Sequence, residues 1–114
     1  MEIKALQAKI REFRDERDWK QFHNPKDMAT AICLESAELL EHFQWRNGAE
    51  IDARAIEKRA EITDEIADIA VYLLELADNL GIDITAAINQ KMVKNATKYP
   101  VAKAKGSNKK YTEL

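Results

Sequence analysis

The sequence predicts a small all-α protein made of one domain. Apolar residues recur at the three- and four-residue spacing of an amphipathic helix in four separate stretches. Only three glycines and two prolines occur among 114 residues, so long uninterrupted helices are permitted. A chain of this length has the usual size of a single domain, but it buries a smaller share of its surface than a large protein does. We therefore expect helices that complete their core by pairing with a second copy.

The first two helices are expected over residues 3–17 and 27–45, joined by a polar and aromatic connection. Asp27 is the expected N-cap of the second helix, and Gly48 follows its end. Four residues at helical spacing form the apolar stripe of this helix: Met28, Ile32, Leu39 and Phe43. Cys33, the only cysteine, lies beside the stripe and is expected to be a small buried residue.

The third helix is expected over residues 59–79, where isoleucine and leucine recur at helical spacing. Residues 49–58 before it are expected to be a connection, with room for a helical turn of its own. The fourth helix is capped by Asp83 or Thr85 and ends at Lys98, because a proline follows shortly after.

The chain is thereby divided into a helical domain over residues 1–100 and a basic tail over 101–114. The tail shows no helical period and is expected to be extended.

A formal net charge of −2 argues against nucleic acid as the main partner. Seven lysines nevertheless occur without an acid between residues 91 and 110: Lys91, Lys94, Lys98, Lys103, Lys105, Lys109 and Lys110. They suit a small anionic ligand, although a solvated tail explains the charge equally well.

The sequence also bears on location. No stretch approaches the roughly 18 apolar residues of a membrane helix. The N-terminus alternates charged with apolar residues, unlike a secretory signal. We expect a cytoplasmic protein with no membrane partner.

Four acids stand on or beside the apolar faces of the second and third helices. Glu35 falls within the apolar stripe of the second helix, and Glu38 follows three residues later. Glu65 and Asp68 repeat this spacing on the third helix, and residues three apart share a helical face. A carboxylate against apolar neighbours is costly unless it is paired or binds a metal. Surface acids and a buried salt-bridge network are the alternatives, but neither stripe supplies basic partners. The two pairs therefore indicate a metal site.

The ligand chemistry favours a hard cation. Oxygen donors suit Mg²⁺, Mn²⁺ or Ca²⁺, whereas zinc usually recruits cysteine or histidine. A di-iron bundle is disfavoured, because its glutamates are followed by histidine three residues later and these are not. Mg²⁺ usually keeps substrate phosphates among its ligands, so a carboxylate-bound Mg²⁺ indicates a phosphorylated substrate.

Several segments carry a resemblance to a known family. Glu35-Ser-Ala-Glu38, then twenty-six residues, then Glu65-Ile-Ala-Asp68 resembles the E-x-x-E…E-x-x-D signature of the MazG-like all-α NTP pyrophosphohydrolases. Residues 91–100 are similar to the family's K-x-x-x-N-x-x-[RK]-Y-P element. Three further segments look closest to the short dCTP pyrophosphatase branch: residues 16–25, 43–45 and 109–114. The resemblance thus covers nearly the whole chain.

The resemblance implies an activity and an assembly. The activity is Mg²⁺- or Mn²⁺-dependent hydrolysis of a nucleoside triphosphate, dCTP or a related deoxynucleotide, to monophosphate and pyrophosphate. Its biological role would be house-cleaning of the nucleotide pool. The implied fold is a four-helix bundle assembled as a homodimer or as a dimer of dimers, which is a homotetramer. Many relatives carry an extra glutamate before the first motif, where this chain has Leu34.

The resemblance also suggests roles for individual residues. The metal ligands are Glu35, Glu38, Glu65 and Asp68. The general base is Glu38 or Glu61, and the residues do not decide between them. The phosphate-binding residues are Lys91, Asn95, Lys98 and Tyr99. The base- and sugar-binding residues are Trp19, Phe22, His23, Trp45 and Tyr72, and a neighbouring copy could complete this wall. Exposed helix faces and ordinary core packing are the alternatives for the lysines and the rings.

A second class of function stays open at this point. The chain could be a non-catalytic helical metal-binding regulatory or assembly module. Its acids would then bind Ca²⁺ or a basic partner rather than a nucleotide.

Overall fold

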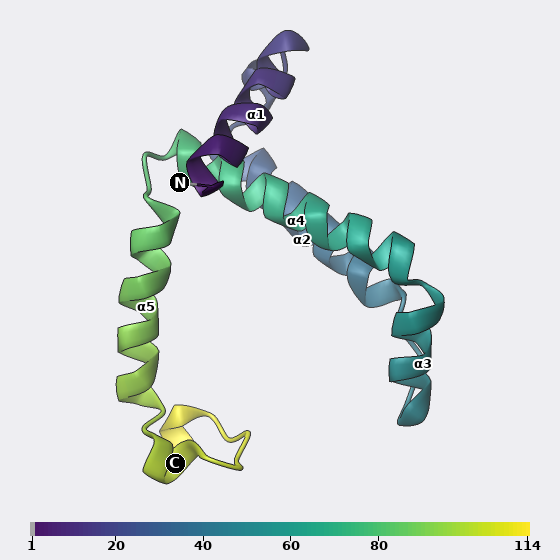
Figure 1. The fold of residues 1–114 in the computed structure, drawn as a ribbon, viewed down its shortest axis with the longest axis vertical. Helices are drawn as coiled ribbons and strands as arrows, with labels where there is room; N and C mark the ends of the chain where they lie inside the picture. Colours follow the sequence, from purple (N-terminus) through teal and green to yellow (C-terminus); the bar gives the residue numbers. More distant parts are fainter. Residues whose placement is uncertain (1) are drawn as a thin grey trace. The chain divides into compact units, whose positions relative to one another are not determined.

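The computed structural model describes residues 2–114, which form helices joined by short connections and contain no strand (Figure 1). The elements are α1 (Glu2–Glu16), η1 (Lys20–Phe22), α2 (Pro25–Glu41), α3 (Ala49–Glu57), α4 (Arg59–Asn79), α5 (Ile84–Lys98), α6 (Val101–Ala104) and η2 (Tyr111–Glu113). The predicted all-α class is confirmed. None of the described helices combines the length and the apolar character needed to cross a bilayer.

Contacts within the chain divide it into two compact units, one ending at Gly81 and one covering Ile82–Leu114. The first unit contains α1 to α4, and the second contains α5, α6 and the tail. This division falls after the third of the four long helices. The predicted helical domain over residues 1–100 and the tail over 101–114 stay predictions.

The first unit is built on the antiparallel pair α2 and α4, which run side by side (Figure 1). His23, just before α2, contacts Glu75 late in α4, whereas His42, just after α2, contacts Glu65 early in α4. Helix α1 packs against the second half of α4, where the side chain of Gln7 donates a hydrogen bond to the carbonyl of Leu74. The first half of α4 contacts α3.

The start of α2 differs from the prediction. Its N-cap is Asn24, whose side chain accepts a 2.9 Å hydrogen bond from the backbone N–H of Asp27. Pro25 occupies the first helical position, where a missing N–H costs nothing. Asp27, the predicted cap, instead lies in the first turn, where its charge interacts favourably with the helix dipole.

The end of α2 also differs. The helix ends at Glu41, four residues earlier than predicted, and the chain then turns through Trp45 in the left-handed region (φ 68°). Residues 49–57, predicted as a connection with room for one helical turn, form α3, a longer helix of nine residues. Of the two caps predicted for α5, Asp83 is the one observed, because its side chain accepts a hydrogen bond from the N–H of Ala86.

Few apolar side chains are fully buried in a single chain. Among the described residues, only Met28 and Ala77 are buried hydrophobic residues. The prediction that Cys33 is buried was wrong, because its face of α2 is not covered by another element of the chain. Ile66 and Leu73, from the apolar stripe of α4, are about half exposed. The helices thus present large apolar surfaces.

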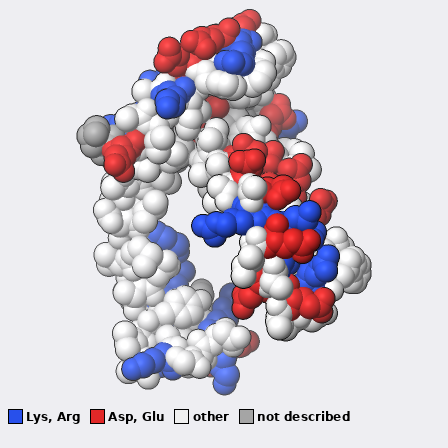
Figure 2. Space-filling view, turned by 45° about the vertical axis from the view of Figure 1, so that its right-hand side comes forward, with Lys and Arg blue, Asp and Glu red and all other residues white. Residues whose placement is uncertain are grey.

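The tail of the second unit is more ordered than an extended segment. It contains α6 and η2, and the rings of Tyr99 and Tyr111 meet edge to face at 6.0 Å. The ammonium of Lys98 lies 4.8 Å from the centre of the Tyr111 ring. The tail therefore folds back onto the end of α5. Lysines provide most of the charged atoms visible in this unit, whereas acids form the larger clusters on the first (Figure 2).

Candidate metal and nucleotide site

The two acidic motifs lie close together between α2 and α4. The pKa of the Glu35 carboxyl is raised, first by burial and then by the negative charges of neighbouring acids. Those acids are Glu38, Asp68 and Glu65. Antiparallel packing thus brings together the four carboxylates that the sequence singles out.

Two oxygens of this cluster are buried without a hydrogen-bond partner: Oε2 of Glu35 and Oε2 of Glu65. The second lies 2.6 Å from Nε2 of His42, but the contact lacks the direction of a hydrogen bond. A buried carboxylate oxygen without a donor carries a large desolvation cost. A cation bound between the helices would remove that cost.

The donor set fits Mg²⁺ or Mn²⁺, because all four side chains offer hard oxygen atoms. Within residues 2–114, no three acidic, histidine or cysteine side chains converge with the spacing of a finished coordination sphere. The four carboxylates are therefore a repelling cluster that a cation would draw together. His42, which the sequence reasoning missed, is placed to hold Glu65 in that cluster.

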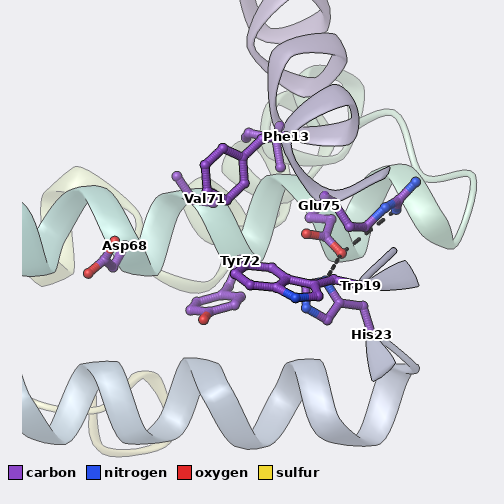
Figure 3. A pocket seen from close by; sticks show the side chains of 9 residues that line it. Phe13, Trp19, His23, Asp68, Val71, Tyr72 and Glu75 are labelled. Carbon is purple, nitrogen blue, oxygen red and sulfur yellow. Dashed lines mark hydrogen bonds and ion pairs between the residues drawn. The ribbon is translucent and has the colours of Figure 1, made fainter. Parts of the chain in front are cut away.

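A cavity of about 160 Å³ opens beside the carboxylates, in the first unit (Figure 3). Asp68 and Tyr72 of α4 line it, with Phe13 of α1 and Trp19 and His23 of the connection. Because Asp68 belongs to both the cavity and the acidic cluster, a ligand in the cavity would extend toward the cation. This arrangement suits a molecule with a ring at one end and anionic groups at the other.

Aromatic rings form one wall of the cavity. The Trp19 ring lies 6.2 Å from the His23 ring and 5.9 Å, edge to face, from Phe13. The pKa of the Tyr72 hydroxyl is raised, first by burial and then by nearby acids that include Glu35 and Asp68. Tyr72 therefore keeps its proton and can donate a hydrogen bond.

Other predicted residues lie outside this cavity. Trp45 is 86% exposed and follows the end of α2 opposite to Trp19, so a helix about 25 Å long separates the two rings. Phe22 is exposed and does not line the cavity. Glu61 is exposed in the first turn of α4, one turn before Glu65.

The predicted phosphate-binding residues belong to the second unit: Lys91, Asn95, Lys98 and Tyr99. Asn95 is half-buried on α5, and Lys91 and Lys98 are exposed. Their association with the acidic cluster stays a prediction.

A buried polar network next to the aromatic rings, whose members Arg14, His23 and Glu75 also line the cavity, was not predicted. Oε2 of Glu75 lies 2.7 Å from Nδ1 of His23 and 3.8 Å from Nη1 of Arg14. The same Arg14 nitrogen donates a 2.9 Å hydrogen bond to Oδ1 of Asn79. His23 and Arg14 also border a second cavity with Arg11, Lys20, Asp78 and Asn79. The available signal was Glu75 itself, a lone acid inside the apolar stretch of residues 69–77.

Comparisons with known proteins identify the family of this chain. The model of the MazG-like family matches residues 30–114. The chain is 40% identical to rat dCTP pyrophosphatase 1 and 38% identical to the human protein of that name, over 99% of its own length. It spans 66% of the length of each of these relatives. A crystal structure of a pyrophosphatase from Archaeoglobus fulgidus is 40% identical, with a TM-score of 0.83 over 88% of this chain and 94% of that one.

The family match covers most of the chain, including both acidic motifs, and the A. fulgidus structure shares its helical fold. The resemblance inferred from the motifs is thereby confirmed, and the chain belongs to the MazG-like family.

Proposed function

We propose that this chain is a metal-dependent nucleoside triphosphate pyrophosphohydrolase. Its substrate is dCTP or a related deoxynucleotide, which it cleaves to the monophosphate and pyrophosphate. The observation that carries the proposal is the pair of buried, unpartnered carboxylate oxygens on Glu35 and Glu65, beside a cavity with an aromatic wall. Relatives named dCTP pyrophosphatase 1 support the substrate class.

Separate sets of residues bind the triphosphate and the base of the substrate. The four carboxylates of α2 and α4 would hold Mg²⁺ or Mn²⁺, which would supply positive charge for the triphosphate and make bound water more acidic. Glu38, a member of the cluster, or Glu61, one turn before Glu65, accepts the proton of the attacking water, since both are exposed carboxylates. Phosphate oxygens are bound by the residues that the family resemblance assigns to them: Lys91, Asn95, Lys98 and Tyr99.

The base occupies the cavity next to Trp19 and His23. Stacking on an aromatic ring stabilises a bound base by about 1–3 kcal/mol and tolerates every base. Discrimination between bases therefore depends on polar groups such as His23. Tyr72 donates its hydroxyl proton to the sugar or to a phosphate oxygen.

We further propose that the chain works as a homo-oligomer, with a tetramer as the expected form. The support is the apolar surface that one chain leaves uncovered. Leu34 and Leu40 on α2 are each more than 60% exposed, and Ile56 on α3 is 80% exposed. Exposed apolar surface on this scale marks an interaction site in most proteins. In this oligomer a neighbouring copy would supply its Trp45 ring to the base-binding wall.

A house-cleaning role and a cytoplasmic location are part of the same proposal, because both follow from a free deoxynucleotide substrate. The alternative, a non-catalytic helical metal-binding regulatory or assembly module, shares the acidic cluster but gives no role to the aromatic cavity.

Product analysis tests the activity. Purified protein is incubated with dCTP and Mg²⁺, and early products are separated by anion-exchange chromatography. We expect dCMP and pyrophosphate in equal amounts, and no reaction when a chelator is present. Accumulation of dCDP with orthophosphate would reject the bond assignment, and absence of any Mg²⁺-dependent turnover would favour the non-catalytic module.

A further inference from the structure

Glu75 is the most buried acid among the described residues, and it lies outside the carboxylate cluster. Its side chain is 4% exposed and lies on α4 beyond Tyr72, where it lines the cavity together with His23 (Figure 3). A buried carboxylate normally requires a cation or several hydrogen-bond donors. Three side chains approach its Oε2 atom: His23 at 2.7 Å, Asn79 at 3.4 Å and Arg14 at 3.8 Å.

The contact with Glu75 determines which nitrogen of the His23 ring carries the proton. Because a carboxylate accepts hydrogen bonds, Nδ1 of His23 must carry the proton that lies toward Glu75. In the neutral imidazole only one nitrogen is protonated, so Nε2 is then a hydrogen-bond acceptor. Arg14 and Asn79 fix the carboxylate on its other side, since Arg14 binds Asn79 and also contacts Glu75. The acid lines the cavity, but its Oε2 atom is held by these side chains and so orients the His23 ring.

We propose that Glu75 is a positioning residue for base recognition, which keeps His23 in the tautomer whose Nε2 accepts a hydrogen bond from an exocyclic amino group. The inference rests on the proposed function, because His23 is assigned to the base. It names the class of base that the site selects. Cytosine carries an amino group at the position where uracil carries a carbonyl, so a fixed acceptor on His23 attracts the first and repels the second.

The same geometry separates Glu75 from the metal site. Glu75 lies ten residues beyond Glu65 on α4, about 15 Å along the helix axis. Removing it should change the choice between bases and not the metal-dependent step. This distinction makes the role measurable, because loss of a metal ligand would slow every substrate equally.

Steady-state kinetics with dCTP and dUTP test the proposal, since these nucleotides differ at one ring substituent. Loss of one well-placed hydrogen bond is worth about tenfold in discrimination. We expect Glu75→Ala to lower the ratio of kcat/KM for dCTP over dUTP by that factor, mainly through the KM for dCTP. Glu75→Gln, which still offers an oxygen acceptor to Nδ1, should keep the ratio within about threefold.

Two controls separate positioning from a general loss of structure. Asp78→Asn removes an acid from the next turn of α4 that pairs with Arg11 rather than His23, and it should leave the ratio unchanged. In a His23→Ala background, Glu75→Ala should have no further effect on the ratio, because it acts through the imidazole. An equal additional loss in that background would overturn the proposal, as would an unchanged ratio in Glu75→Ala alone.

A spectroscopic measurement is independent of the enzymatic activity. Long-range ¹H–¹⁵N correlation spectra of the metal-free protein report which imidazole nitrogen carries the proton at mildly alkaline pH. We expect His23 protonated on Nδ1 in the wild type and mixed tautomers in Glu75→Ala. A wild-type ring protonated on Nε2 would reject the positioning role. Absence of turnover on any nucleotide, with the expected tautomer present, would reject the proposed function and leave the tautomer assignment standing.

Discussion

Helix α4 carries acids in two different electrostatic environments. Glu65 and Asp68, in its first half, lie with Glu35 and Glu38 in the acidic cluster, where the negative charges repel one another. Glu75, in its second half, is buried against Arg14 and His23. Both arrangements place carboxylates among apolar residues. We call the first group unpaired because Oε2 of Glu35 and Oε2 of Glu65 lack a hydrogen bond, even though His42 lies 2.6 Å from Glu65.

The difference assigns a separate role to each group. Acids whose charges are balanced within the chain contribute to one defined structure, and losing a partner is costly. Acids that repel one another destabilise the metal-free chain, so their presence is explained by a cation that the chain does not supply. The unpaired acids of the cluster therefore indicate the metal site. The paired acid, Glu75, indicates the residue that positions His23 for binding the nucleotide base.

The largest effect is expected at the unpaired group. Asp68→Asn removes a ligand charge, so Mg²⁺-dependent turnover should fall by about 100-fold or more. The metal-free protein should keep its melting temperature or gain a little, because one repelling charge is lost. Turnover and thermal melting are measured in parallel, with Asp64→Asn as the control, an exposed acid of the same helix. Wild-type turnover in Asp68→Asn would remove it from the site.

The paired group should show the reverse pattern. Arg14→Ala leaves Glu75 buried without its guanidinium, and the free energy of unfolding should fall by about 3 kcal/mol. Arg11→Ala, which breaks an exposed pair with Asp78, should cost less than about 1 kcal/mol. Urea unfolding at a fixed protein concentration compares the two. Equal losses would show that burial of the Arg14 network contributes nothing.

Trp45 allows stability and function to be separated at one position. Its left-handed backbone is strained for a bulky residue, so Trp45→Gly should stabilise the fold by about 1 kcal/mol. Loss of the ring should raise KM about tenfold for every nucleotide if a neighbouring copy uses it for stacking. Chemical unfolding and a nucleotide panel are the measurements. Unchanged KM values would exclude Trp45 from the base wall.

The smallest effect concerns pH in the absence of metal. Burial and neighbouring carboxylates raise the pKa of Glu35 above its ordinary 4.5, so the folded chain binds this proton more tightly than the unfolded chain. The contribution of Glu35 to stability is therefore full below pH 4.5 and is lost as the pH rises through the raised value. With chelator present, Glu35→Gln should flatten this decline in melting temperature. Parallel curves for the two proteins would contradict the shift.

The acidic cluster could be predicted from the sequence, but its surroundings could not. Glu35 and Glu65 interrupt apolar stripes, and helical spacing alone places each beside its partner acid. Trp19 and His23 lie on a connection without periodicity, so only the packing of α1 on α4 reveals that they line a cavity. Cys33 was misjudged because helical spacing shows which face is apolar, and not whether the same chain covers that face.

Thermal melting with and without Mg²⁺ tests the contrast between the two groups most directly, using the wild type, Glu65→Gln and Glu75→Gln. A ligand that binds only the folded state raises the melting temperature. We expect Mg²⁺ to stabilise the wild type and Glu75→Gln alike and to have no effect on Glu65→Gln. Stabilisation of Glu65→Gln by Mg²⁺, or its loss in Glu75→Gln, would contradict the assignment of the cation to the unpaired acids.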